Sequence, residues 1–194
     1  MSSSNGILSA LAVILRSALG RSARVPPAGT PRPRLVPQAG SASHGGRRDG
    51  DEPGRMAGTE TIRVDPERIT GLTVSYAPQR DGDPDAGEVI WTWVPYEEND
   101  GRGKDRPVLV IGAQSGDRVY AVRMTSKPHD GSRDYLPIGS GAWDGQGRES
   151  WVDIEQLYSV HREGMRREAA VLDRARYAKV ASALIARYHW AHEG

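Results

Sequence analysis

Three polar side chains stand at the ends of two apolar runs, where they could act together on one small anion. Arg106 opens the run Arg106-Pro-Val-Leu-Val-Ile-Gly112, and Thr125 with Ser126 closes the run Val122-Arg-Met-Thr-Ser126. Short runs rich in β-branched residues and bounded by Gly, Pro or Asp are typical of antiparallel strands. Because strand ends meet at one rim of a small barrel, we expect a guanidinium and a hydroxyl to converge on a phosphate-sized anion.

The two hydroxyls cannot both reach this rim, because successive side chains of a strand face opposite ways. His129 follows Thr125 by four residues, and histidine is the side chain whose ordinary pKa suits proton transfer near neutral pH. Other interpretations remain open. Arg106 could be a surface residue paired with Asp105 or Glu98, Thr125 an ordinary residue at a strand end, and His129 a solvent-exposed residue of a turn.

The composition argues against a metal enzyme or a disulfide-linked domain. The chain has no cysteine, and its five histidines show no spacing typical of zinc ligands. Its net charge of +1 divides unevenly, with +5 on residues 1–58 and −4 on the remainder. An acidic folded part can bind a polyanion only through a local basic patch. The residues that could form it are Arg102, Lys104, Arg123, Lys127 and Arg133.

The composition also divides the chain along its length. Residues 1–58, rich in Arg, Pro, Gly and Ser, are expected to be a disordered extension. Its apolar segment 6–20 is too short to span a bilayer and is followed, not preceded, by Arg, so we expect neither membrane association nor a secretory signal. Residues 59–85 form a transitional segment with a helical turn at 65–69 capped by Asp65, and residues 86–192 form the domain proper.

The domain is expected to be mainly β with one helix, an α+β fold built on a small SH3-like barrel. The helix begins after Asp173 and places an apolar stripe against the open end of the barrel. Residues 153–157 are expected to form a short turn, and 95–104 a long charged loop. Strands are predicted at 72–76, 88–94, 107–113, 117–124, 134–138 and 150–153, with a tight hairpin loop at 114–117.

Four pieces of this pattern resemble the PemK/MazF family of toxin endoribonucleases. They are Gly87-Glu-Val-Ile-Trp91, Arg106-Pro-Val-Leu-Val110, Met124-Thr-Ser126 and, more weakly, Asp153–Val160 with Glu155-Gln156 at the family's Asp-Gln position. The resemblance covers roughly residues 86 to 190.

The resemblance implies a toxin of a type II toxin–antitoxin system that works in the cytoplasm as a homodimer and is neutralised by a cognate antitoxin. It implies cleavage of single-stranded RNA without a metal or other cofactor, through attack by the neighbouring 2′-hydroxyl. Arg106 and Thr125 match the family's catalytic positions, with His129 as a further candidate. The residues expected to bind RNA are Arg102, Lys104, Ser126, Lys127 and Gln156.

Two other functions remain open from the sequence. The same barrel also occurs in CcdB-like toxins that bind gyrase, so the chain could be a catalytically silent module that acts on a protein partner. A generic SH3-like module that binds peptides or cell wall would need an exposed aromatic groove. The presence of both Arg106 and Thr125 distinguishes an endoribonuclease from these binding modules, because a protein that only binds a partner does not need this pair.

Overall fold

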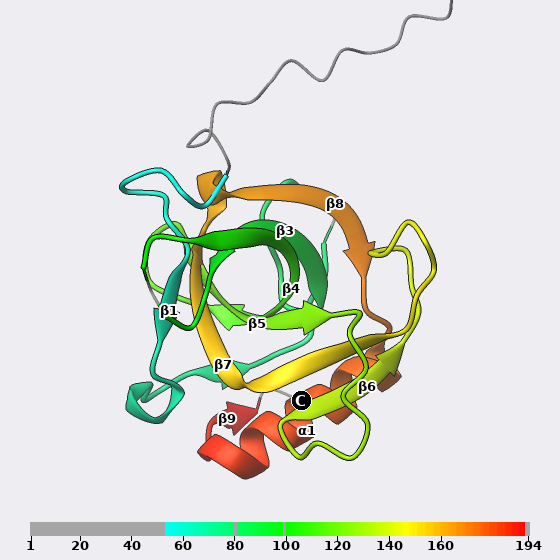
Figure 1. The fold of residues 1–194 in the computed structure, drawn as a ribbon. Coiled ribbons are helices and arrows are strands. Elements are labelled where there is room, and N and C mark those ends of the chain that lie inside the picture. Colours follow the sequence, from blue (N-terminus) through cyan, green and yellow to red (C-terminus); the bar gives the residue numbers. More distant parts are fainter. Residues whose placement is uncertain (1–52, 80, 99, 193–194) are drawn as a thin grey trace, which may run out of the picture. The chain divides into compact units, whose positions relative to one another are not determined.

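The computed structural model describes residues 53–79, 81–98 and 100–192, and it is drawn in Figure 1. The chain divides into two units, Met1–Ser43 and His44–Gly194, and everything below concerns the second. The expected disordered extension, up to residue 52 and including the apolar segment 6–20, lies outside the described residues. Among the described helices, none has the length and apolar character needed to cross a bilayer.

The second unit is built on one antiparallel sheet that curls strongly on itself (Figure 1), which confirms the predicted mainly-β class with a C-terminal helix. The order of its strands is β1-β7-β5-β4-β3-β8, and β6 pairs with β7 on a branch of this path. The strands are β1 (Ile62–Val64), β3 (Glu88–Pro95), β4 (Gly103–Ala113), β5 (Arg118–Thr125), β6 (Tyr135–Gly139), β7 (Ser150–His161) and β8 (Met165–Val171).

The strand β4 has a continuous apolar run at residues 107–111, because both faces of the sheet are buried there. In β4, Val108 and Val110 point into one cluster with Tyr158, whereas Leu109 and Ile111 point into a second, larger one. A strand that is covered on both faces has no reason to alternate polar and apolar residues. The hairpin loop at residues 114–117 joins β4 to β5 as predicted, closed by a hydrogen bond from the Gln114 N–H to the Arg118 carbonyl.

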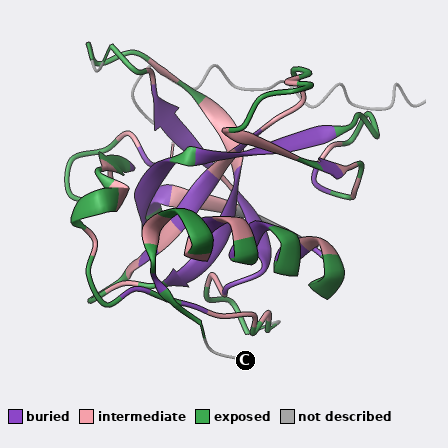
Figure 2. Ribbon diagram, turned by 90° about the horizontal axis from the view of Figure 1, so that it is seen from below, coloured by how far each residue is buried: buried purple, intermediate pink, exposed green. Residues whose placement is uncertain are grey.

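The larger cluster lies beneath the helix α1 (Arg174–Tyr188). The Asp173 carboxylate caps it by accepting from the Arg176 N–H at 3.0 Å, as the sequence predicted. Figure 2 shows the helix lying along the sheet, so it covers a face of the sheet and not an open end. The Tyr177 hydroxyl donates to the Ile111 carbonyl at 3.2 Å and ties the helix to β4.

The prediction of a short turn at residues 153–157 was wrong, since β7 continues through it for 12 residues. The register of β7 on β5 jumps here, from Leu157 opposite Val122 to Val152 opposite Met124. The Asp153 carboxylate accepts from the Glu155 N–H within this irregularity, as it would in a turn. The residues that predicted a turn at 153–157 therefore form a bulge inside a paired strand.

The loop predicted at 95–104 is shorter than expected, because β4 already begins at Gly103. Trp93 packs on this glycine, where a Cβ would lie 2.5 Å from the Trp93 ring and from the Val94 carbonyl oxygen. Within the large sheet, the strands β1 and β8 were not predicted at all. Both are edge strands of the path, paired with β7 and β3 respectively.

The transitional segment is an integral part of the unit. Asp65 caps the 3₁₀ turn η1 (Pro66–Arg68), as predicted. The strand expected at 72–76 is the two-residue β2 (Thr73–Val74), which pairs in parallel with β9 (Ala191–His192).

Residues 53–58 also contact the sheet. The Pro53 carbonyl accepts from the Trp93 N–H at 3.1 Å, and the Gly54 carbonyl accepts from the Thr61 N–H at 2.8 Å. Gly54 has a φ of +84° and no room for a Cβ, which would meet the Thr92 hydroxyl at 2.2 Å. We therefore propose that the folded unit begins at or before Pro53, earlier than the boundary expected after residue 58.

Candidate active site

The strand register places Arg106 and Thr125 opposite each other. Val108 of β4 pairs with Arg123 of β5, and continuing this antiparallel register by two residues brings Arg106 opposite Thr125. Side chains two apart on a strand share a face, so Arg106, Thr125 and Arg123 stand on one face of the sheet at one end of the hairpin. The convergence predicted from the sequence is present.

Two recesses meet at this pair. The tryptophan recess has a volume of about 200 Å³, and the tyrosine recess has a volume of about 250 Å³. Arg106 and Thr125 line both of them, and the remaining walls differ. The tryptophan recess is completed by Trp91, Lys104, Asp105, Pro107, Met124, Ser126, Trp143, Asp144, Arg148 and Ser150, and the tyrosine recess by Arg123, Lys127, His129 and Tyr135. A chain of linked groups laid across both would pass over Arg106 and Thr125.

The Arg106 guanidinium is available to a ligand. It is half-buried, and within the part of the chain that the structure describes it makes no hydrogen bond or ion pair. Its expected alternative partner, Asp105, is instead engaged by Arg166. A permanently charged planar donor without a protein partner is suited to bind phosphate oxygens.

The Thr125 hydroxyl is held in place by its own turn. Its oxygen accepts from the Lys127 N–H at 3.1 Å, and a hydroxyl that accepts one bond can still donate its hydrogen. Ser126 lines the tryptophan recess only, whereas Thr125 lines both. This difference favours Thr125 as the hydroxyl nearest to Arg106.

A buried ion pair forms the floor of the tyrosine recess. Arg123 donates to the Asp153 carboxylate at 2.6 Å and to the Tyr135 hydroxyl at 3.0 Å. Burial by itself lowers the pKa of Arg123, but the neighbouring Tyr158, Asp153 and Tyr135 raise it overall. Burial, and the Asp153 carboxylate after it, also raises the pKa of Tyr135, so this phenol stays protonated.

His129 stacks on the Tyr135 ring, with the ring centroids 3.6 Å apart and the planes 2° from parallel. It is half-buried in the tyrosine recess and close to Thr125 in the fold as well as in the sequence. The structure thus brings all three candidate catalytic residues, Arg106, Thr125 and His129, to one place.

The candidate RNA-binding residues separate into two groups. Lys104 and Ser126 line the tryptophan recess and Lys127 the tyrosine recess. Arg102 lines neither and instead forms an ion pair with Asp100 at 2.7 Å in the loop before β4. Gln156 is buried, donating to Glu97 at 2.7 Å and accepting from the Tyr158 hydroxyl at 2.6 Å, so its amide is occupied within the protein.

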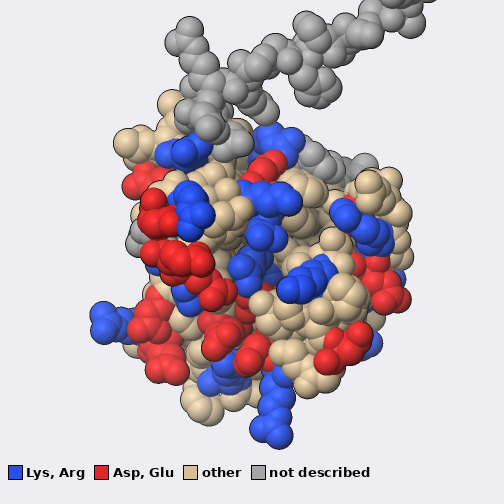
Figure 3. Space-filling model, in the orientation of Figure 1, with Lys and Arg blue, Asp and Glu red and all other residues tan. Residues whose placement is uncertain are grey.

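Figure 3 shows a band of Lys and Arg side chains on one face, bordered by acidic side chains. Of the five residues expected to form a basic patch, Lys104, Arg123 and Lys127 line the recesses, and Arg102 and Arg133 line neither. The sequence-based prediction missed Arg148, which lines the tryptophan recess and pairs with Asp144 at 2.9 Å. It also missed Tyr135. Only the sequence position of Tyr135, at the start of a predicted strand after Lys127 and His129, could have drawn attention to it.

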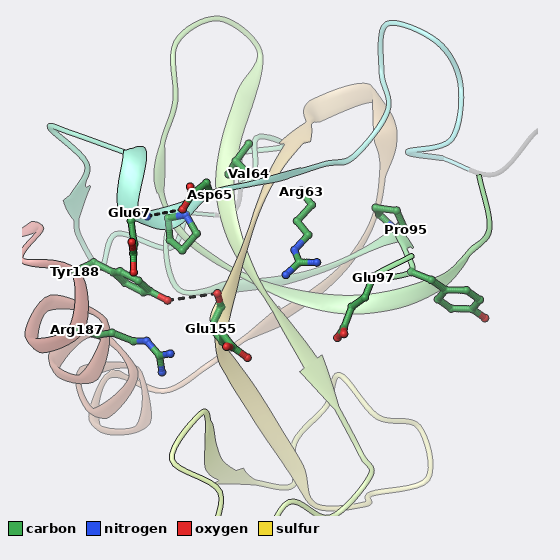
Figure 4. A pocket seen from close by; sticks show the side chains of 11 residues that line it. Arg63, Val64, Asp65, Glu67, Pro95, Glu97, Glu155, Arg187 and Tyr188 are labelled. Carbon is green, nitrogen blue, oxygen red and sulfur yellow. Dashed lines mark hydrogen bonds between the residues drawn. The ribbon is translucent and has the colours of Figure 1, made fainter. Parts of the chain in front are cut away.

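A further cavity lies away from Arg106 and has the wrong charge for a phosphate. Its volume is about 520 Å³, and its walls come from β1, η1, β7, the end of α1 and the loop after β3 (Figure 4). Arg63 and Arg187 face four carboxylates there, and Arg187 is already paired with Asp134 at 2.6 Å. The carboxylates are Asp65, Glu67, Glu97 and Glu155. An excess of carboxylates repels polyanions, so we place the anion site at Arg106.

Among the described residues, no group of three or more His, Asp or Glu side chains is arranged to hold a metal ion.

A strongly curled antiparallel sheet covered by one helix defines a small β-barrel protein, with Arg106 and Thr125 side by side at its rim. Residues 85–187, just over half of the chain, match the family described as "PemK-like, MazF-like toxin of type II toxin-antitoxin system". The chain belongs to this family, which confirms the resemblance seen in its sequence motifs.

Solved structures give a consistent comparison. The chain is similar to MazF (Form-I) from Deinococcus radiodurans, with 19% identity, a TM-score of 0.43, and coverage of 54% of this chain and 96% of that one. A MazE-MazF complex (Form-II) from the same organism has 20% identity and a TM-score of 0.41, and the match covers 54% of this chain and 94% of that one. An endoribonuclease from a mycobacterial species has 12% identity and a TM-score of 0.40, and the match covers 56% of this chain and 94% of that one. A search of curated proteins returned no match.

Proposed function

We propose that this protein is an endoribonuclease that cuts single-stranded RNA without a metal ion, using attack by the 2′-hydroxyl next to the scissile phosphate. The observation that carries the proposal is the Arg106 guanidinium, which has no partner among the described residues and lies beside Thr125 where two recesses meet. Membership in the toxin family supports it. The products would be one fragment with a 2′,3′-cyclic phosphate (or 3′-phosphate) and one with a 5′-hydroxyl.

The residues at the rim match the charge changes of this reaction. The 2′-oxygen attacks phosphorus and gives its proton to solvent, while the bond from phosphorus to the 5′-oxygen breaks and that oxygen takes up a proton from solvent. During this exchange negative charge accumulates on the non-bridging oxygens. Arg106 supplies a donor fork for these oxygens, and the Thr125 hydroxyl supplies a further donor. Donors placed where charge develops stabilise the transition state more than the ground state. Lys104 and Lys127, in the two recesses, would hold the neighbouring phosphates.

The partners follow from the family. We propose that a cognate antitoxin covers the two recesses and blocks RNA, and that the protein acts in the cytoplasm, where messenger RNA is present. We also propose a two-fold symmetric homodimer, which light scattering would show as twice the chain mass. One of the similar structures is a MazE-MazF complex from Deinococcus radiodurans, in which a MazF protein is bound to a second protein, MazE.

The test is a cleavage assay on single-stranded RNA in EDTA. Arg106→Ala should slow cleavage by roughly 10²–10³. Arg106→Lys should also lose most activity, because a point charge does not reproduce the planar fork. Thr125→Val keeps the β-branched shape and removes only the hydroxyl. Arg68→Ala is the matched control, since Arg68 is an exposed arginine of η1 that lines neither recess, and it should leave cleavage unchanged.

Two results would refute the mechanism. Cleavage that needs added magnesium would assign the chemistry to a metal, and cleavage that survives Arg106→Ala would remove the central residue. A wild-type protein that cuts no RNA would instead favour a module that acts by binding a protein partner.

A further inference from the structure

The stacked pair of rings beside Thr125 is built unlike an ordinary aromatic contact. His129 lies face to face on Tyr135, with centroids 3.6 Å apart and an interplanar angle of 2°. Aromatic pairs in proteins usually prefer offset or edge-to-face arrangements. Both rings line the tyrosine recess together with Arg106 and Thr125, and His129 is the half-buried residue that comes from the turn.

The Tyr135 ring of this stack is held in place by a hydrogen bond to its hydroxyl. The Tyr135 hydroxyl accepts from Arg123 at 3.0 Å, and Arg123 is itself held by the buried Asp153 at 2.6 Å. His129, by contrast, makes no side-chain hydrogen bond within the described ranges, so its ring is positioned by stacking alone. Because Tyr135 is held in place and His129 stacks on it, a third planar ring can stack on His129 in turn.

We propose that the His129–Tyr135 pair is a stacking platform for one unpaired nucleobase of the RNA, next to the phosphate held by Arg106. This rests on the proposed function and deepens it, since it assigns the tyrosine recess to a base. Unpaired bases of single strands bind on aromatic faces, and every base has a face to offer. His129 is then a positioning residue that contacts the base, and it does not take the 2′-hydroxyl proton.

The geometry distinguishes the two roles of His129. A general base must direct a ring nitrogen at the proton that it removes, at hydrogen-bond distance. A stacking residue offers its ring face, and a phenylalanine can replace it. His129→Phe and His129→Ala therefore separate the roles, because only alanine removes the face, whereas both remove the titrating nitrogen.

The first experiment measures binding without cleavage. Single-stranded 2′-deoxy oligonucleotides lack the attacking hydroxyl, and 2-aminopurine placed at successive positions reports stacking by loss of its fluorescence. We expect quenching at one position with the wild-type protein and with His129→Phe. Quenching should be lost with His129→Ala, and affinity should fall roughly 5- to 150-fold. His192→Ala is the control, because His192 is an exposed histidine in β9 that lines neither recess.

The second experiment measures steady-state cleavage of RNA. His129→Ala should raise KM, and His129→Phe should keep both KM and kcat close to the wild-type values. A kcat that falls roughly 10²–10⁴ in both variants would identify a general base and overturn the platform. Wild-type binding without quenching at any position would also overturn it. If the wild-type protein quenches 2-aminopurine but cuts no RNA, the platform stands and the proposed nuclease activity fails.

Discussion

The ion pair under the tyrosine recess should contribute measurably to folding stability, and its loss can be predicted from burial. The Asp153 side chain is 1% exposed and that of Arg123 is 13% exposed, with 2.6 Å between the charged groups. Replacing Arg123 by Met would leave a buried carboxylate without its cation, although it still accepts from the Glu155 N–H at 3.0 Å. Removing one partner of a buried pair typically costs about 3–5 kcal/mol.

Two features bring the expected cost toward the lower end of this range. The Arg123 Nε is buried without a hydrogen-bond partner among the described residues, so the pair is not fully satisfied in the native protein. Glu97 also lies 3.8 Å from the guanidinium on a side chain that is 61% exposed, where it contributes little. At about 3 kcal/mol, the melting temperature of a domain of this size should fall by roughly 6–12 °C.

The assay is urea denaturation followed by tryptophan fluorescence, with the two single variants Arg123→Met and Asp153→Asn and their combination. Asn keeps an oxygen for the Glu155 N–H and removes the charge. The double variant should lose less free energy of unfolding than the two single variants lose together, and the difference should be at least about 1 kcal/mol. Strictly additive losses with unchanged m values would refute the reasoning that the pair stabilises the fold as a unit.

Two further predictions concern the N-terminal boundary and alkaline pH. A chain that starts at residue 59 should melt at a lower temperature than one that starts at residue 50, because the Trp93 N–H loses its Pro53 acceptor; equal melting temperatures would show that residues 53–58 contribute nothing. Burial raises the pKa of Tyr158 to about 12, so the folded state holds this proton more tightly than the unfolded chain does. The resulting stabilisation is present below pH 10 and lost as pH rises through 12, by about 3 kcal/mol. Tyr158→Phe should reduce the loss of stability at alkaline pH by this amount in urea melts, and an undiminished loss would assign it to other groups.

The parts of the fold that could be predicted are those with a local cause. The hairpin loop at residues 114–117 follows from its turn residues, and α1 from the Asp173 cap with its apolar stripe. The pairing of Arg106 with Thr125 followed from the resemblance to the family and not from the hairpin. Counted from Ala113 opposite Val119, the tight loop would put Arg106 opposite Ser126, and the bulge between Val110 and Gly112 shifts the register by one residue.

What could not be predicted depends on partners distant in the sequence. β8 is a strand because it pairs with β3, although its own residues, Met165–Val171, include several charges. Gln156 looked like a surface residue for RNA, but Tyr158 and Glu97 engage its amide within the protein. The stack of His129 on Tyr135 depends on the path of the turn between β5 and β6, and no spacing in the sequence reports that path.

The site divides its tasks between rigid and irregular parts of the chain. Arg106 and Thr125 belong to β4 and β5, strands whose neighbouring residues are buried on both faces, so the groups assigned to the chemistry are held by the core itself. His129 belongs to the turn after β5, where residues 126–134 are exposed or half-buried. Replacement of His129 by Ala should therefore weaken RNA binding while leaving the rate at saturating RNA unchanged. Changes that loosen β4 or β5 should lower the rate for every sequence alike.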